Sequence, residues 1–221
     1  MSQTNDKEMV ILLHGIGHNK VFMIATEKAL QAEGYDTLNI SYPSLRQNIK
    51  ELSRWLSEQL IEHRIWENSS KVHFVVHSLG GLVSGTYLED YKDTIPQEKM
   101  GRVVMLGTPH GGSEVADFLK ENPLYIWAFG PAGQELTTEA RQEQKIHPWY
   151  ELGIIAGAPD KTFTIGQFFI DTEHDGCVSV ESTKIEGMTA HKTMPVLHSF
   201  MAWMPDVQKQ VVHFLQQGTF E

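Results

Sequence analysis

The sequence predicts an α/β fold in which helices cover both faces of a mostly parallel central sheet. Short apolar segments of strand character alternate along the chain with longer segments of helical periodicity. This alternation is typical of parallel strands that are joined through helices. With 221 residues, of which 41% are hydrophobic, the chain can bury one substantial core without disulfides or metals. We therefore expect residues 1–221 to form a single domain.

The strands and helices follow one another in a regular order. The strands are predicted at residues 9–14, 37–42, 72–76, 102–106, 152–156 and 193–197. The helices are predicted at residues 20–32, 45–63, 79–91 and 206–216, with Gly34 and Gly218 as stop signals after the first and the last. Residues 114–150 interrupt the alternation, because they are rich in aromatic side chains and punctuated by prolines. We expect this segment to be a cap or lid inserted between two core strands.

The chain is acidic, with 28 Asp and Glu residues against 18 Lys and Arg and a net charge of −10. A nucleic-acid partner requires a basic surface, so nucleic acid is not expected as the main partner. Electrostatic attachment to anionic membranes is disfavoured for the same reason. The composition leaves the oligomeric state open.

The compartment is inferred from the cysteine content and from the start of the chain. Cys177 is the only cysteine, so no disulfide can form within the chain, which fits a reducing compartment. The first eight residues are polar, and the apolar run at 9–13 is too short for a signal-peptide core or a membrane span. We therefore expect a cytoplasmic protein without stable membrane insertion.

Residues 76–80 read Val-His-Ser-Leu-Gly and nearly match the nucleophile-elbow pattern Gly-x-Ser-x-Gly. A tight strand–turn–helix presents such a serine on strained backbone, and the amides of the new helix point to where negative charge develops. Ser78 is therefore the candidate nucleophile. Val76 departs from the pattern, because a β-branched residue crowds the point where strand and helix meet. The alternative is that Ser78 is only a helix N-cap after a buried strand.

A second motif, His14-Gly15-Ile16-Gly17, follows the first predicted strand. Together with the Ser78 motif it resembles the α/β-hydrolase family of lipases and esterases. In that family a His-Gly-x loop and the residue after the nucleophile supply the two amides of the oxyanion hole. The resemblance thus implies an α/β-hydrolase fold, with the backbone N–H groups of Ile16 and Leu79 as oxyanion donors. The alternative is a glycine turn without chemical consequence.

The resemblance also implies an acid and a base later in the chain, in the order Ser, Asp, His. Asp175 lies in a segment reading Asp-Gly-x-Val-x-x-x-Ser, which is similar to the acid-bearing segment of the lipase-like members. Asp171 and Glu173 are its nearby rivals. His198 follows the last predicted strand, where the family keeps its base, whereas the rival His191 precedes that strand.

The remaining histidines near these motifs receive structural roles. His77 is expected to be a packing and hydrogen-bonding residue whose side chain points away from that of Ser78. His14 and His110 are expected to order their loops. There is no glycine-rich phosphate loop, no paired-cysteine motif and no His-Glu-x-x-His motif, so we expect no cofactor and no metal site, with calcium left open.

The segment at 124–129 is too apolar to lie free in water. Its side chains Tyr125, Trp127 and Phe129 either line an acyl pocket or pack on the sheet as core. An apolar pocket beside a serine nucleophile favours a lipid ester or a small carboxylic ester as substrate. The same residues could also act on a thioester or an amide, or transfer the acyl group to another acceptor. The remaining alternative is a non-catalytic binding module on a hydrolase scaffold.

Overall fold

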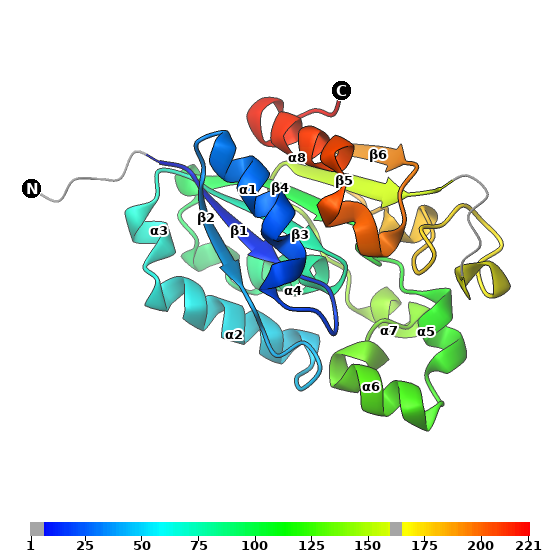
Figure 1. Cartoon of the computed structure of the whole chain (residues 1–221). Helices are drawn as coiled ribbons and strands as arrows, with labels where there is room; N and C mark the ends of the chain where they lie inside the picture. The colour runs from blue at the N-terminus through cyan, green and yellow to red at the C-terminus, as the bar shows by residue number, and fades with distance from the viewer. Residues whose placement is uncertain (1–6, 160–164) are drawn as a thin grey trace, which may run out of the picture.

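The computed structural model describes residues 7–159 and 165–221, which contain a six-stranded sheet (Figure 1). The strands are β1 (Met9–Leu13), β2 (Asp36–Ile40), β3 (Val72–His77), β4 (Met100–Leu106), β5 (Leu152–Gly157) and β6 (Ala190–Met194). Their order across the sheet is β2-β1-β3-β4-β5-β6, and every neighbouring pair is parallel. The predicted parallel sheet is confirmed, and all carboxyl ends of its strands lie at one edge.

Helices cover both faces of the sheet (Figure 1). One layer contains α1 (Ile24–Ala32) and α8 (Pro205–Gln217), and the other contains α2 (Ile49–Glu62), α3 (Ile65–Asn68) and α4 (Leu79–Asp90). Each layer closes its own hydrophobic cluster against the sheet. The central strands β3 and β5 are buried along their whole length, whereas the edge strands β2 and β6 remain partly accessible. This difference explains why the central strands are mostly apolar in the sequence.

The segment between β4 and β5 carries the short helices α5 (Glu114–Leu119), α6 (Pro123–Gln134) and α7 (Thr138–Glu143). In Figure 1 these helices lie beyond the carboxyl ends of the strands, outside the two helical layers. The chain turns sharply within α6 at Gly130, which has a φ of 61°. A left-handed φ of this kind is open to glycine at little cost.

Two predicted boundaries are corrected by local hydrogen bonding. The helix predicted at 45–63 begins only after Asn48, whose side chain accepts a hydrogen bond from the Glu51 N–H while the Glu51 carboxylate accepts one from the Asn48 N–H. This reciprocal capping fixes the start of α2. The segment predicted as one helix at 20–32 is a 3₁₀ turn (Lys20–Met23) followed by α1.

The last strand was predicted at 193–197, and this was wrong, because β6 covers Ala190–Met194. Pro195 has no N–H to donate to the sheet, so the ladder ends before it. The apolar Val196 beyond it is buried as part of a loop and packs into the cluster beneath α1 and α8. His191 therefore lies inside the last strand rather than before it.

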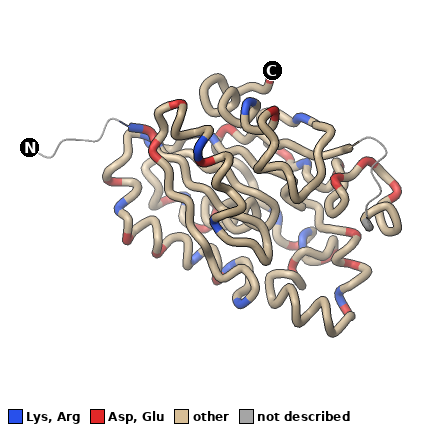
Figure 2. Tube along the Cα trace, viewed as in Figure 1, with Lys and Arg blue, Asp and Glu red and all other residues tan. Residues whose placement is uncertain are grey.

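The described surface mixes both signs of charge. Lys and Arg residues are interspersed with Asp and Glu along the chain (Figure 2). Several of them pair, as in the contacts of Arg102 with Glu151 at 2.6 Å and of Lys184 with Glu181 at 2.6 Å. Within residues 7–159 and 165–221, no helix combines the length and the apolar character needed to cross a bilayer.

The first turn of α4 lies unusually close to the end of β1. A Cβ atom on Gly80 would lie 2.8 Å from the Leu13 carbonyl oxygen and 2.9 Å from that of His14. These are backbone atoms, so a larger residue would have to push the helix away from the strand.

We therefore expect Gly80→Ala to destabilise the fold by about 1–3 kcal/mol through overpacking. In an unconstrained helix the same change would stabilise by up to about 1 kcal/mol, so the sign of the effect is diagnostic. Chemical denaturation measures it, and Thr86→Ala on the same helix is the matched control, expected to change stability by less than about 0.5 kcal/mol. A stabilised Gly80→Ala protein would contradict the close approach.

Candidate active site

A pocket of about 200 Å³ lies at the carboxyl edge of the sheet. Ser78 follows β3, and His198 lies beyond the end of β6 in a 3₁₀ turn (His198–Trp203). Gly15 and Ile16 follow β1, and Pro109 follows β4. All five line the pocket, because parallel strands end at the same edge and their following loops meet there.

Ser78 occupies a strained turn between β3 and α4. Its backbone φ of 53° and ψ of −122° are values that residues other than glycine rarely adopt. The Ser78 N–H donates to the Leu106 carbonyl at 2.9 Å, and the Ser78 carbonyl accepts from the Gly81 N–H at 2.9 Å. The side chain lies at the pocket wall, in a residue that is 6% exposed. The backbone therefore forms the tight strand–turn–helix that the motif predicts.

Val76 does not prevent this turn. Its side chain is fully buried in the cluster that lies beneath α2 and α4, and its backbone pairs with Leu13 and Met105 in the sheet. The helix lies close to the end of β1 at Gly80, four residues further along the chain, where a Cβ atom would lie 2.8 Å from the Leu13 carbonyl oxygen. Room for the helix is therefore supplied by Gly80, and position 76 is free to carry a core side chain.

The side chains of Asp175 and His198 are joined by a short hydrogen bond of 2.6 Å between Oδ2 and Nδ1. The other carboxylate oxygen accepts from the backbone N–H groups of Cys177 at 2.9 Å and Val178 at 2.8 Å. Gly176, with a φ of 101°, allows the tight turn that brings these amides round the carboxylate. A carboxylate accepts such a bond, so Nδ1 carries a proton, and in the neutral imidazole Nε2 then keeps its lone pair. This is the tautomer required of a general base.

The rival residues lie elsewhere. Asp171 and Glu173 are exposed, and within the described chain neither contacts the His198 ring. His191 lies in β6, and its Nε2 is 2.9 Å from the Thr183 hydroxyl.

In the described structure no hydrogen bond joins the Ser78 hydroxyl to the His198 ring, although both line the pocket. Catalytic hydrogen bonds are often long without a ligand and tighten when substrate binds. Ser78 and His198 thus lie at the wall of the same pocket, and the hydrogen bond to Asp175 already fixes the orientation of the His198 ring.

His77 is fully buried next to His198. Its Nε2–H donates to the His198 carbonyl at 3.0 Å, and its ring centroid lies 4.6 Å from that of His198 and 4.6 Å from that of Phe22. Burial, together with the charge that His198 would carry, lowers the pKa of His77 well below 6.5. A neutral imidazole therefore supports the backbone of His198, which is the packing and hydrogen-bonding role expected of His77. The residue also lines the same pocket as Ser78, which was not expected.

His14 orders the loop after β1. Its Nδ1–H donates to the Gly15 carbonyl at 2.8 Å, and its Nε2 accepts from the Tyr42 N–H at 3.3 Å. The Tyr42 hydroxyl donates to the His14 carbonyl at 2.6 Å, and burial lowers the His14 pKa to about 4. In the described chain, the N–H groups of Ile16 and Leu79 have no acceptor. Two backbone donors are therefore free beside the Ser78 turn.

The aromatic residues of α6 do not share one environment. Tyr125 and Phe129 both line the pocket, with ring centroids 4.8 Å apart, and the Tyr125 hydroxyl donates to the Gly133 carbonyl at 3.1 Å. Trp127 is 82% exposed and is not part of the lining. Residues four apart share a helix face, whereas residues two apart point about 200° from each other. The structure therefore separates Trp127 from the two residues with which it was grouped.

Several pocket residues were missed by the sequence analysis. They belong to the loops after β1 and β4, to the start of α5 and to the turn around Asp175, and they are His18, Pro109, Ser113, Val115, Cys177 and Val178. His18 lies directly after the His-Gly-Ile-Gly motif, and burial lowers its pKa. Its position one residue beyond that motif was a usable signal. Within the described residues there is no cluster of three or more His, Cys, Asp or Glu side chains suited to a metal ion.

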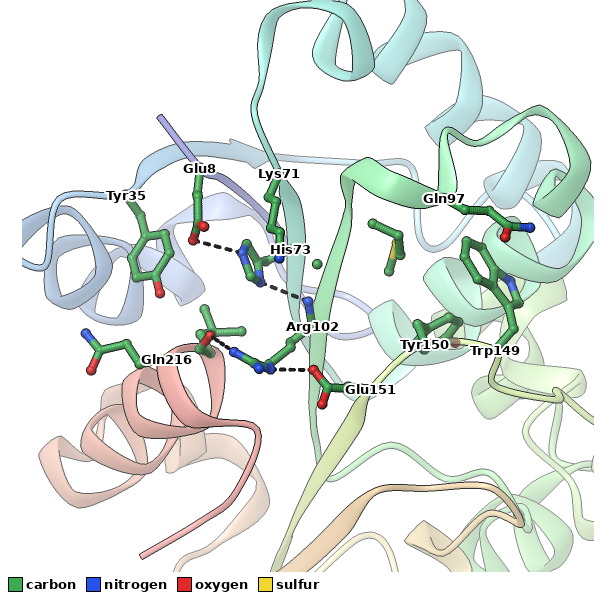
Figure 3. Close-up of a pocket in the computed structure, with 13 residues that line it drawn as sticks. Glu8, Tyr35, Lys71, His73, Gln97, Arg102, Trp149, Tyr150, Glu151 and Gln216 are labelled. Carbon is green, nitrogen blue, oxygen red and sulfur yellow. Dashed lines mark hydrogen bonds and ion pairs between the residues drawn. The ribbon is translucent and has the colours of Figure 1, made fainter. Parts of the chain in front are cut away.

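A larger cavity of about 580 Å³ lies at the opposite, amino-terminal edge of the sheet (Figure 3). Its buried His73 lies 3.2 Å from a Glu8 oxygen and accepts from the Arg102 N–H at 2.9 Å. The Arg102 side chain in turn donates to Glu151 at 2.6 Å and to the Leu215 carbonyl at 2.7 Å. The polar side chains of the larger cavity thus bond to one another. They are less available to react with a substrate than the residues of the pocket at Ser78.

Comparisons with known proteins give no sequence relative: no protein-family model matches the chain, and no curated protein matches it. The structure is nevertheless similar to solved structures. The mature lipase BlEst2 of Bacillus licheniformis superposes with a TM-score of 0.77 at 21% identity, over 99% of this chain and 94% of that one. A metagenomic carboxyl esterase superposes with a TM-score of 0.69 at 16% identity, over 90% and 66% of the two chains.

A third similar structure is the thioesterase RedJ of the prodiginine pathway of Streptomyces coelicolor. It superposes with a TM-score of 0.59 at 12% identity, over 96% of this chain and 85% of that one. At sequence identities this low, structural similarity indicates a shared fold but does not indicate a shared substrate. Sheet order, helical layers and these similarities together show that the chain has the α/β-hydrolase fold.

Proposed function

We propose that the protein is a serine hydrolase that cleaves carboxylic esters. The observation that carries the proposal is the buried Asp175–His198 pair, bonded at 2.6 Å, at the pocket whose wall also holds Ser78 on its strained turn. A structural histidine needs no buried carboxylate, and a plain helix cap needs no left-handed backbone. A serine on a strained turn and a histidine bonded to a buried carboxylate, brought together at one pocket, are the arrangement that a nucleophile, base and acid require.

In the proposed reaction Ser78 Oγ attacks the ester carbonyl while its proton passes to Nε2 of His198. The tetrahedral intermediate collapses, its C–O bond breaks, and the leaving alcohol takes the proton from Nε2. Water then attacks the acyl-serine and gives a proton to Nε2, which returns it to Ser78 as the carboxylic acid departs. Asp175 holds the tautomer and stabilises the imidazolium formed in each half.

The free N–H groups of Ile16 and Leu79 are the proposed oxyanion donors. Gly15 supports this assignment, because a Cβ atom on it would lie 3.1 Å from the Ser78 Cβ, so the loop after β1 lies directly against the nucleophile. Removing one such donor costs about 3 kcal/mol of transition-state stabilisation in a well-studied hydrolase.

The proposed acyl pocket is formed by Tyr125 and Phe129, with residues 114–150 acting as a cap over the site. Further apolar side chains in the lining are Ile16, Val115, Ala116, Leu136 and Val178. Such a wall suits the acyl group of a lipid ester or a small carboxylic ester. The same chemistry would serve a thioester or an amide, and the similarity to a thioesterase keeps the thioester as the second candidate.

Replacing Ser78 with Ala removes the proposed nucleophile. Ester hydrolysis and labelling by a fluorophosphonate probe should both fall to background, while the thermal midpoint changes little because a single hydroxyl is lost. Ser199, which also lines the pocket but does not lie on the strained turn, supplies the matched control. Ser199→Ala should keep labelling. Labelled Ser78→Ala protein would mean that the nucleophile lies elsewhere, and an unlabelled wild type would favour a binding module.

Asp175→Asn should lower kcat by about 10⁴-fold, the loss known for the corresponding change in a serine protease, because the amide favours the wrong imidazole tautomer. Asp171→Asn and Glu173→Gln are controls from the same segment and should each cost less than about tenfold. Steady-state kinetics on a soluble ester measure all three. A nearly wild-type Asp175→Asn enzyme with one inactive rival would reassign the acid and leave Ser78 and His198 in place.

Truncation of the pocket aromatics tests the acyl site. Tyr125→Ala and Phe129→Ala should raise KM mainly for longer acyl chains, since each methylene in an apolar pocket contributes about 1 kcal/mol. Trp127→Ala on the same helix is the control, because its exposed side chain is outside the lining. It should leave chain-length selectivity unchanged. A uniform loss of stability without a change in selectivity would favour core packing as the role of Tyr125 and Phe129.

A further inference from the structure

Arg141 of α7 is a buried cation with no carboxylate of the described chain within ion-pair distance. The residue is 2% exposed. Its guanidinium donates to the Gln144 side-chain oxygen at 3.0 Å and to the Gln144 carbonyl at 2.8 Å, while Nε has no acceptor in the described structure. No Asp or Glu of the described chain forms an ion pair with Arg141. The Glu135 carboxylate acts on Arg141 only from beyond ion-pair distance, so the hydrogen-bond acceptors of the buried guanidinium are all neutral. Such burial of a charge is costly, so this arrangement calls for an explanation.

A cavity of about 210 Å³ lies against this arginine, and we refer to it as the Arg141 cavity. Its lining contains three Lys or Arg residues against one acid and consists of His110, Gly111, Arg141, Gln142, Gln144, Lys145, Ile146, His147, Lys184, Ile185 and Glu186. Glu186 is the only acid among them, and Lys184 pairs with Glu181 outside the lining at 2.6 Å. Lys145 has no ion-pair partner in the described chain. The cavity therefore carries an excess of positive charge in a protein whose net charge is −10.

His110 is the second buried polar group at this cavity. Its Nε2 lies 3.2 Å from the Met105 sulfur, a weak partner, and its Nδ1 has no partner within the described residues. Burial and the nearby charge of Arg141 lower the His110 pKa to about 3, so the ring is neutral at pH 7. A neutral imidazole still holds one N–H, which on Nδ1 would be available to an acceptor.

We propose that the Arg141 cavity binds a small oxyanion, such as a phosphate or carboxylate group. A planar guanidinium matches the geometry of such groups and binds them through two N–H donors at once. Gln144 is exposed, so its neutral side-chain oxygen can give up its place on Arg141 to a charged oxygen. The bound anion would neutralise the buried cation and contact Lys145 at the rim.

This site is separate from the pocket at Ser78. Pro109 and Ser113 line the pocket at Ser78, whereas His110 and Gly111, between them in the same loop, line the Arg141 cavity. The two cavities have no lining residue in common. Anion binding at Arg141 is therefore independent of whether the proposed ester hydrolysis is correct.

The test measures the thermal midpoint of the full chain against anion concentration at constant ionic strength, with chloride as the reference. Inorganic phosphate, glycerol 3-phosphate and acetate are the probes. A specific site should raise the midpoint by roughly 3–5 °C per tenfold concentration above its dissociation constant. A response to phosphate and glycerol 3-phosphate identifies a phosphate site, and a response to acetate alone identifies a carboxylate site. No rise beyond chloride for any probe would overturn the proposal and leave Arg141 as a cap for its own helix end.

Two variants locate the response. Arg141→Gln should abolish it, whereas Arg54→Gln, an exposed arginine on α2, should keep it. Lys145→Gln changes only an exposed side chain, so it should fold even where Arg141→Gln does not, and it should weaken the apparent affinity several-fold. If Arg141→Gln folds and its thermal midpoint still rises with the anion as in the wild type, the anion binds elsewhere and the proposal is refuted. If Arg141→Gln does not fold, an undiminished rise in Lys145→Gln refutes the proposal in the same way.

Discussion

The contact between the first turn of α4 and the end of β1 is the constraint on which the candidate site depends. Gly80 lies against the carbonyl oxygens of Leu13 and His14, at distances that leave no room for a side chain. Because the helix begins there, Ser78 must reverse the chain within one residue, which forces its left-handed backbone. The same contact brings the Leu79 amide next to the loop that carries Ile16. One packing distance thus sets the positions of the proposed nucleophile and both proposed oxyanion donors.

The proposed acid and base are positioned by a different part of the fold. Asp175 is held by two backbone amides of its own turn, and its carbonyl also accepts the His198 N–H at 2.9 Å. The two residues are therefore connected through backbone as well as side chain, so the imidazole cannot drift without disturbing the turn. His77 adds a third restraint through the His198 carbonyl. Rigid support of this kind limits the reorganisation that a reaction would need.

The sequence predicted the features that local chemistry determines and missed those that depend on tertiary packing. The Ser78 turn follows from a short motif, and Asp175 and His198 were implied as partners by the resemblance to the α/β-hydrolases. The last strand was misplaced because apolar content was weighted above the missing N–H of Pro195. Trp127 was grouped with its neighbours by composition, although helical spacing separates it from them. Arg141 gave no signal at all, since a charged side chain in a polar segment does not by itself predict burial.

The histidines around Ser78 differ in their partners, and this difference separates the proposed base, His198, from the other candidates. His14 and His77 are desolvated and have no carboxylate partner, so their pKa values lie far below 7 and both rings stay neutral. A charged ring at either position would repel the imidazolium that His198 must form during the proposed reaction. His198 alone is bonded to a buried carboxylate, which stabilises that cation. The surrounding imidazoles can therefore serve as neutral hydrogen-bonding and packing groups without competing for the proton.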